Sequence, residues 1–447
     1  MLEAAIFYGL IAVIIFTAIP YGTVDPWSQA VFECAVFFIG LLWLGHALLT
    51  GSWRVRNLQL VMPMIALVGL AILQSLRWSQ IDLAGVRVFR SISADPFETR
   101  AFALRLAALI LAFVLFVRFT TSHRRLSLLV HALIGLAIVC ALFGLARQAL
   151  QHGDGFLLTR LKPGVGYAQF INKDHFSYLM EMAFGLTVSV AFMPGNLERI
   201  PLYLSGVIIM WAALVLSSSR GGLLAMTIQV VLAAFLFLTS RKKARGAAEF
   251  IQGKRRFRSA LANVLVTVVL VMIMIAGVAW LGGDQLATAV ETASIEMGGA
   301  DTSELHEAAR RRDIWRASWR MFLQHPIAGA GLAGYWAEVP AFHEGSGVST
   351  PQQAHNDYLE MLASGGLIGA TILIWFVVAL IQQTRRNIQS SKGFQHAVSV
   401  GAIVGVAGVA VHSVVDFGLH VGVNALVLMA LLALLSPKPF KELGIEN

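Results

Sequence analysis

Charged residues are scarce in this chain of 447 residues: Asp, Glu, Lys and Arg make up 13% of it, against roughly 25% in ordinary soluble domains. Hydrophobic residues account for 57%, and the mean hydropathy is +0.72. This composition excludes an ordinary soluble domain. It indicates a protein that lies mostly inside a membrane.

Several signatures of enzyme chemistry are also missing from the sequence. It has no Asp-x-Asp pair for a divalent metal, no Walker-type phosphate loop, and neither a His-Glu-x-x-His nor a Gly-x-Ser-x-Gly motif. Its two cysteines, Cys34 and Cys140, both fall inside apolar runs, where a disulfide or metal role is not expected. We therefore expect no metal and no cofactor. The net charge of +9 is spread over many loops, which argues against nucleic-acid binding.

The apolar runs have lengths close to the ~20 residues that a helix needs to cross the hydrocarbon core. They predict an all-α polytopic membrane protein with about twelve transmembrane helices, because backbone groups in lipid must be satisfied within the helix. The predicted spans are 2–20, 30–49, 58–75, 101–119, 127–149, 174–193, 200–218, 222–239, 260–281, 359–381, 396–415 and 420–435.

The orientation of these spans follows from the basic loop 241–258, which we place in the cytoplasm by the positive-inside rule. Counting outward from it, both termini are cytoplasmic. The chain then divides into helices one to nine (1–281), a long periplasmic loop with amphipathic helices (282–358), and helices ten to twelve with a short cytoplasmic tail (359–447). The segments 76–100 and 150–173 and the corner 217–222 also face outward.

These outer segments carry more Arg and Lys than the rule predicts. Such residues suggest an anionic ligand on the outer side; contact with lipid headgroups or with acidic groups of the protein is the alternative. The clearest case is the segment 304–324, which has the helical periodicity of an amphipathic helix that begins near Asp301. Leu305, Ala308, Trp315, Trp319 and Phe322 form its expected apolar stripe, beside a row of Arg312, Arg316 and Arg320.

Segments far apart in the sequence together resemble the O-antigen ligase and O-antigen polymerase superfamily of bacterial envelope glycosyltransferases. They are the corner 217–222 (SSSRGG), the stretch from 311 to 331 (RRDIW to HPIAGAG) and the segment 355–366 (HNDYLE to GG). Residues 170–176 (FINKDHF) and 412–417 (HSVVDF) add to the match. Each motif alone is weak, but their order on a chain of many spans is fairly specific.

The resemblance implies a C-type glycosyltransferase architecture that works without metal or nucleotide. Family members take a glycan from undecaprenyl pyrophosphate on the periplasmic side of the inner membrane. They pass it to another lipid-linked glycan as polymerases, or to the lipid A core as ligases. The stretches 95–99 and 412–417 favour the polymerase slightly. The phospholipid membrane is the other expected partner.

The resemblance also implies roles for particular residues. Arg220 is expected to bind the pyrophosphate, and Arg311 to make a second contact, with Arg312 as an alternative. Arginine suits this task because it stays charged and offers a planar fork to phosphate oxygens. His355 is the expected general base, since a histidine ordinarily titrates near pH ~6.5 and can accept a hydroxyl proton when neutral. The structural alternatives are a snorkelling arginine and a hydrogen-bonded, helix-capping histidine.

Further residues are candidates for substrate binding, each with a structural alternative. His175, Asn172 and Lys173 head one span, and Tyr358 follows His355. Arg316 and Arg320 equally suit lipid anchoring. His412 and Asp416 are expected one turn apart near the end of a span, where ionisable groups are functional by default, or form a mutual pair. The full set of expected binding residues beyond the pyrophosphate site is His175, Asn172, Lys173, Arg316, Arg320, Tyr358, His412 and Asp416.

The rival interpretation is a transporter or flippase for a lipid-linked glycan. Transporters usually have paired halves with broken helices at matching positions, and no such symmetry is visible in the sequence. The glycosyltransferase hypothesis requires that Arg220, Arg311 and His355 converge in one outward-facing pocket.

Overall fold

The structure is a computed structural model that describes residues 1–53, 57–83, 86–151, 157–158, 160–161, 165–193, 197–246, 305–343 and 351–436. The chain divides into two compact units. Unit 1 comprises Met1–Leu129, Gly299–Ser390 and Ser413–Asn447. Unit 2 comprises Val130–Gly298 and Ser391–His412.

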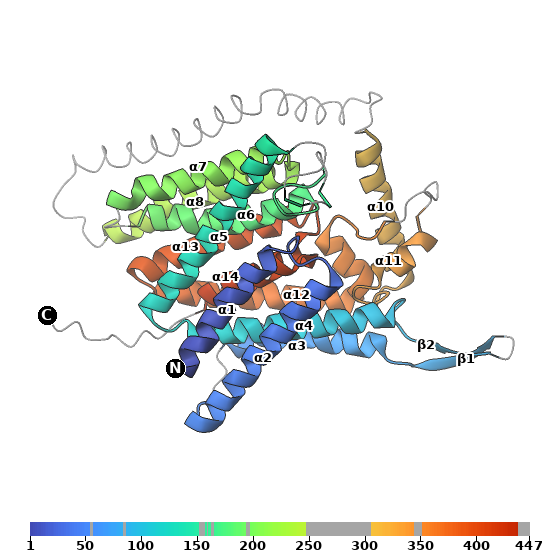
Figure 1. The fold of residues 1–447 in the computed structure, drawn as a ribbon. Coiled ribbons are helices and arrows are strands. Elements are labelled where there is room, and N and C mark those ends of the chain that lie inside the picture. The colour runs from blue at the N-terminus through green and yellow to red at the C-terminus, as the bar shows by residue number, and fades with distance from the viewer. Residues whose placement is uncertain are drawn as a thin grey trace. The chain divides into compact units, whose positions relative to one another are not determined.

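Unit 1 is built mostly from long helices (Figure 1). They are α1 (Leu2–Ala18), α2 (Pro26–Thr50), α3 (Leu58–Ser75), α4 (Pro96–Phe119), α10 (Leu305–Gln324), α12 (Asp357–Ser390) and α14 (Gly422–Leu434). Shorter elements are α11 (Tyr335–Glu338), η2 (Val339–Ala341) and η3 (Gly418–His420). α3 packs against α4 and α12, and α14 packs against α4.

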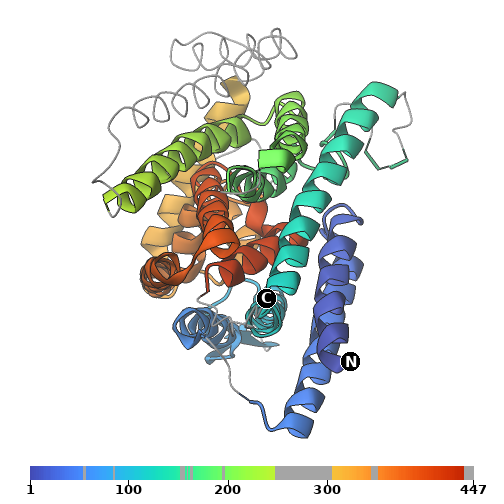
Figure 2. The ribbon, with the colours of Figure 1, turned by 90° about the vertical axis from the view of Figure 1, so that its left-hand side faces the viewer.

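Unit 2 is formed by α6 (Lys173–Ala191), η1 (Leu197–Arg199), α7 (Ile200–Leu216), α8 (Arg220–Gly246) and α13 (Gly393–His412). α5 (His123–Leu150) begins in unit 1 and continues into unit 2. α6 is central to unit 2, because α13, α7 and α8 all pack against it (Figure 2). At the α6–α13 crossing, a Cβ on Gly185 would collide with the carbonyl oxygen of Gly401. Small residues thus let these two backbones approach closely, as in many membrane helix pairs.

Seven described helices are long and apolar enough to cross a membrane, and α1, α7 and α14 are shorter apolar helices. This agrees with the predicted polytopic membrane protein. Each predicted span coincides with a described helix except 260–281, which lies outside the described residues. α6 is not among these ten apolar helices of the described chain; its sequence contains Lys173, Asp174 and Glu181. The total of about twelve spans and their orientation remain predictions.

A β-hairpin that the sequence analysis did not predict occupies part of the segment 76–100. β1 (Ser79–Leu83) pairs antiparallel with β2 (Val86–Arg90), with Ser79 opposite Arg90 and Ile81 opposite Val88. In Figure 1 the hairpin projects beyond the ends of α3 and α4. Polar and apolar residues alternate over 80–83 in β1 and over 86–88 in β2, which is a short stretch of the usual pattern of a strand. This local period of two is much shorter than the apolar runs that predicted the helices.

α12 breaks inside its apolar stretch, and the break is paired with a distant segment. Gly366 has φ 61° and ψ −161°, which interrupts the helix. The backbone N–H groups of Leu367 and Ile368 donate to the carbonyls of Pro326 and Ile327 (2.8 and 3.1 Å). In return, Ala330 and Gly331 donate to the carbonyls of the first half of α12. The groups freed by the break are therefore satisfied, as membrane-embedded backbone requires.

Two of the glycines after His325, Gly329 and Gly331, belong to this paired segment. The side chain of Gln74 on α3 reinforces it. Its amide nitrogen donates to the carbonyls of Ala328 (2.5 Å) and Ser364 (2.9 Å), while its oxygen accepts from Leu332 N (3.0 Å).

α10 packs on α12 through a face that differs from the predicted apolar stripe. The buried face is centred on Ile314, Ala317 and Met321. Of the predicted stripe, Phe322 is buried but Trp319 is 48% exposed. Asp301, Glu304 and the side chains of Leu305 and Ala308 lie outside what the structure describes.

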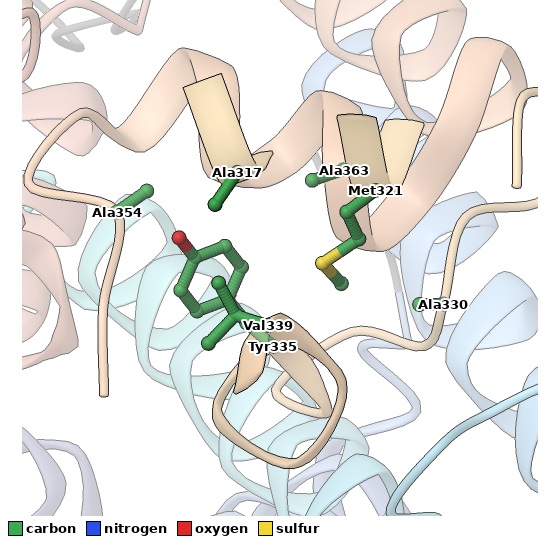
Figure 3. Close-up of a cluster of buried hydrophobic side chains, with 7 residues drawn as sticks. All are labelled: Ala317, Met321, Ala330, Tyr335, Val339, Ala354 and Ala363. Atoms are coloured by element: carbon green, nitrogen blue, oxygen red, sulfur yellow. The ribbon is translucent and has the colours of Figure 1, made fainter. Parts of the chain in front are cut away.

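The buried cluster beneath α10 joins it to the loop before α12 (Figure 3). Tyr335 lies at the centre of the cluster, and its hydroxyl hydrogen-bonds to Ser318 (2.7 Å). The cluster consists of Ala317, Met321, Ala330, Tyr335, Val339, Ala354 and Ala363. The side chain of Tyr335 is only 1% exposed, so it forms part of this core and is not available to stack on a sugar.

Candidate functional site

His355 lies in the loop that leads into α12, in a conformation that few residues adopt. Its φ is 49°, in the left-handed region, which is uncommon for a residue other than glycine and costs free energy. Its ring nitrogen Nδ1 lies 3.2 Å from Oδ1 of Asp416, and its ring packs edge-on against Phe417. The imidazole is 33% exposed, whereas the Asp416 side chain is 1% exposed. A buried carboxylate thus orients a histidine that solvent can reach.

The backbone of Ala354, the residue just before His355, is held from both sides. Trp315 on α10 donates its indole N–H to the carbonyl of Ala354 (3.0 Å). Glu360 on the first turn of α12 accepts from the Ala354 N–H (2.8 Å). Because the N–H and the C=O of Ala354 are both hydrogen-bonded, the backbone conformation just before His355 is fixed. These contacts stabilise the left-handed backbone conformation of His355, in which the imidazole lies against Asp416.

The start of α12 brings further ionisable groups close to this loop. Asn356 caps the helix by accepting from Leu359 N (3.0 Å), a usual task for asparagine. Nε2 of His420 lies 3.5 Å from Glu360 and 3.7 Å from Asp357. Besides Asp416, unit 1 thus has two more carboxylates near this loop, those of Asp357 and Glu360, and both lie close to His420.

The arginines of α10 present their side chains mainly to solvent. Arg312, Arg316 and Arg320 are exposed, and Arg311 is half-buried. Arg316 forms an exposed i,i+3 pair with Asp313 (3.4 Å), a kind of contact that contributes little to stability. Arg311 lies one helical turn before Trp315, so the helix that holds the His355 loop also carries this arginine. Tyr358 is 41% exposed on α12.

In unit 2, Arg220 is the first residue of α8 and is exposed. Ser219 caps this helix by accepting from Gly222 N (3.1 Å), and its hydroxyl donates to Asp174 of α6 (2.5 Å). Asn172 caps α6 by accepting from Asp174 N (2.9 Å). The two helix starts are therefore linked through Ser219 and Asp174, which explains why the sequence has polar residues at both.

Lys173 and His175 follow that cap with different exposures. Lys173 is exposed, whereas His175 is 7% exposed and belongs to the packed part of α6. Gly222 allows α8 to pack tightly here, because an added Cβ would lie 2.6 Å from the side chain of Ser177. The roles of Asn172, Lys173 and His175 in substrate binding remain predictions.

His412 and Asp416 had been expected one turn apart at the end of a span, but α13 ends at His412. Nδ1 of His412 lies 2.6 Å from Oε1 of Glu181 on α6, and both side chains are fully buried in unit 2. The ring of His412 stacks on Tyr178 at 4.3 Å. Asp416, in unit 1, is the partner of His355. Each residue therefore has a partner that the sequence analysis did not assign.

The candidates fall into two sets by unit. Unit 1 holds His355, Asp416, Arg311, Arg312, Arg316, Arg320 and Tyr358. Unit 2 holds Arg220, Asn172, Lys173, His175 and His412. The convergence of Arg220 with Arg311 and His355 in one pocket remains a prediction.

A comparison with protein families supports one of the two classes considered so far. Residues 205–374 match the family model of O-antigen ligase. The resemblance to the O-antigen ligase and polymerase superfamily is therefore confirmed, and with it a glycosyltransferase-like function of ligase or polymerase type in a bacterial membrane. No curated protein matched the chain.

The O-antigen ligase match includes Arg220, Arg311 and His355 but ends before Asp416. The sequence analysis had named Asp416 without assigning it to His355, and it had missed Glu181. Both are ionisable residues in or beside apolar segments, and such residues are costly unless they are paired or functional. Glu181 could have been recognised in the sequence as a charged residue inside an apolar segment. Nothing in the sequence indicated which residue would be the partner of Glu181 or of Asp416.

Proposed function

We propose that this protein transfers a glycan from an undecaprenyl-pyrophosphate carrier to a sugar hydroxyl at the periplasmic face of the bacterial inner membrane. The pairing of His355 with Asp416 carries this proposal. When Nδ1–H of His355 donates a hydrogen bond to Asp416, Nε2 is the basic nitrogen of the imidazole and can take the proton of an acceptor hydroxyl. The carboxylate also stabilises the imidazolium that forms.

The proposed reaction is a single displacement. The acceptor oxygen forms a bond to the anomeric carbon while the bond from that carbon to the pyrophosphate oxygen breaks. The hydroxyl proton passes to His355, and the bonding electrons leave with the carrier pyrophosphate. Arg220 and Arg311, with Arg312 as the alternative to Arg311, stabilise the charge that develops on this group. One displacement inverts the anomeric configuration, so a product with retained configuration would contradict the mechanism.

The decisive test replaces His355 by alanine in the purified full-length protein supplied with lipid-linked repeat units. Loss of the general base lowers the transfer rate by about 100-fold or more. Asp416→Asn should lower it as well, because an amide holds the ring but cannot stabilise its positive charge. Arg220→Ala should also reduce transfer.

A matched control is His46→Ala, which removes another histidine of unit 1 that pairs with a carboxylate, at 3.6 Å from Glu3. This variant should transfer glycan at the wild-type rate. If His355→Ala also retains that rate while the protein remains folded, the proposed role of the histidine is wrong.

Polymerase and ligase differ only in the acceptor, and we favour the polymerase slightly. Supplying the purified protein with repeat units, with and without a lipid A core acceptor, separates the two. Longer lipid-linked chains without the core identify a polymerase, and glycan attached to the core identifies a ligase.

A flippase for the lipid-linked glycan is the alternative function. In cells that carry His355→Ala, the enzyme hypothesis requires the precursor to accumulate on the outer leaflet of the membrane. Accumulation on the inner leaflet would favour the flippase.

A further inference from the structure

His420 is an ionisable residue of unit 1 that the proposed mechanism does not use. It is the last residue of η3, and its imidazole is 38% exposed. Nε2 lies 3.5 Å from Oε1 of Glu360 and 3.7 Å from Oδ1 of Asp357. A ring nitrogen that faces two carboxylates carries a hydrogen, because a bare lone pair there would be repelled. The Nε2–H group of His420 is therefore attracted to the first turn of α12 whether the imidazole is neutral or charged.

Glu360 connects His420 to the loop that carries His355. Its Oε2 accepts from the N–H of Ala354 (2.8 Å), and its Oε1 is the oxygen that lies near His420. The amide of Gln353 can also donate to Oε1 (2.7 Å), but Gln353 belongs to the same loop as His355. His420 comes from a separate segment of the chain. Its contact with Glu360 therefore joins that segment to the loop.

The segment 413–420 is attached to the start of α12 at both of its ends. At the first end, the carbonyl of Ser413 accepts from the first N–H of α12 (2.9 Å). At the second end, His420 contacts the two carboxylates of the helix. Asp416 lies between these two points, and its Oδ1 is 3.2 Å from Nδ1 of His355. The loss of one attachment would allow the Asp416 carboxylate to move away from the imidazole.

Phe417 provides a second link between the two histidines. Its ring centroid lies 4.8 Å from that of His355 and 5.8 Å from that of His420, and both imidazoles pack edge-on against it. Phe417 directly follows Asp416 in the sequence. A displacement of His420 therefore also removes packing from the residue next to the catalytic carboxylate.

We propose that His420 is a positioning residue for glycan transfer, and that its contact with Glu360 keeps Asp416 in place beside His355. It acts through Asp416 and not on the substrate. The inference rests on the proposed function, since it concerns the histidine that serves as the general base there. A residue of this kind affects kcat while leaving donor binding intact, because other residues bind the pyrophosphate.

The test compares His420→Asn with His420→Gln in the full-length protein supplied with lipid-linked repeat units. Both variants lose the packing of the imidazole on Phe417, but asparagine is one carbon shorter, so only the glutamine amide takes the place of Nε2. His420→Asn should lower kcat by about fivefold, the effect of losing one polar contact, with little change in the KM for the donor. His420→Gln should stay within about twofold of the wild-type kcat, because its N–H restores the contact to Glu360. Since His420 is exposed, neither variant empties the core.

His46 provides a matched control in the same unit. Its Nε2 lies 3.6 Å from Oε1 of Glu3, and its ring packs edge-on against Phe119. The contacts of His46 thus resemble those of His420 in kind and in distance. His46→Asn and His46→Gln should both transfer glycan at the wild-type rate.

A double variant tests the route through Asp416. In an Asp416→Ala background, His420→Asn should cause no further loss of kcat, because the carboxylate that His420 positions is already absent. Three results would overturn the inference: equal kcat values for His420→Asn and His420→Gln, a full additional loss in the double variant, or a rise in the donor KM with kcat unchanged.

The same measurements separate this inference from the proposed function. His355→Ala should lose transfer whichever residue stands at position 420. If it does so while His420→Asn and His420→Gln are equal, the positioning role is wrong and the proposed function stands. If His355→Ala retains transfer, the proposed function itself is wrong.

Discussion

His355 and Asp416 are 61 positions apart in the sequence, yet their side chains form the pair on which the proposed chemistry depends. The positive φ of His355 shows that the pair is held by the surrounding structure, because an isolated histidine would leave this conformation. Trp315 and Glu360 fix the preceding peptide. At the scale of residues, the candidate site therefore includes two groups that act on His355 through the backbone of Ala354.

Trp315→Phe tests this positioning. The change keeps an aromatic ring, although a smaller one, and removes the hydrogen bond to the Ala354 carbonyl. We expect kcat for glycan transfer to fall by about fivefold to tenfold, in line with the loss of ~1 kcal/mol from one hydrogen bond, while the KM for the lipid-linked donor changes little.

Trp319→Phe serves as the control, because Trp319 lies on the same helix but is 48% exposed. It should leave kcat unchanged. An equal loss of kcat in both variants would mean that α10 tolerates no change of its tryptophans, and that the contact to Ala354 has no particular role.

At the scale of elements, the break in α12 is the feature that organises unit 1. The first half of α12 ends at Gly365 and Gly366, and the segment after α10 supplies hydrogen-bond partners for the backbone groups that the break leaves without helical partners. The side chain of Gln74 donates hydrogen bonds to both of these paired segments. The loop that carries His355 precedes the first half of α12, so the break bears directly on the placement of the histidine.

Gly366→Ala should destabilise the protein strongly. Its φ and ψ are accessible essentially only to glycine, at a cost of ~1–3 kcal/mol for other residues, and a Cβ there would collide with the carbonyl of Ile327. The thermal unfolding midpoint in detergent is the measurement.

Gly369→Ala, three residues further along the same helix, is the control. An added Cβ at Gly369 lies at ordinary contact distance, 3.4 Å from Sδ of Met361. This variant should unfold close to the wild-type temperature. Equal midpoints for the two variants would show that the break at Gly366 is not required.

At the scale of the whole molecule, the proposed function depends on which side of the membrane each loop faces. The basic loop 241–258 predicts a cytoplasmic location for itself and a periplasmic location for the His355 loop. The two native cysteines, Cys34 in α2 and Cys140 in α5, are both free thiols, so a cysteine-free background for labelling removes no disulfide.

A Gln352→Cys variant in a cysteine-free background should react with a membrane-impermeant maleimide in intact spheroplasts, because Gln352 is exposed beside His355. Lys254→Cys should react only after the membrane is permeabilised. The reversed pattern would put the histidine in the cytoplasm and would contradict glycan transfer at the periplasmic face.

The membrane class, the positions of most helices and the family could all be inferred from the sequence. The length of an apolar run and the charge of the loops beside it can be read from short stretches of sequence. They determine whether a segment inserts into the membrane and in which orientation. The caps Asn172 and Ser219 are polar residues at the starts of spans, but they had not been predicted as caps. Arg220 and His355 were named through the family resemblance, and their roles in transfer remain predictions.

Only the tertiary structure decided which residues are partners. Asp416 bonds to His355, Glu181 to His412, and Gln74 to a segment more than two hundred positions away. A buried polar group must find a partner, but the sequence does not specify which one, because that depends on the packing of helices distant in the chain. The left-handed backbone at His355 has the same origin, since contacts from separate elements hold it.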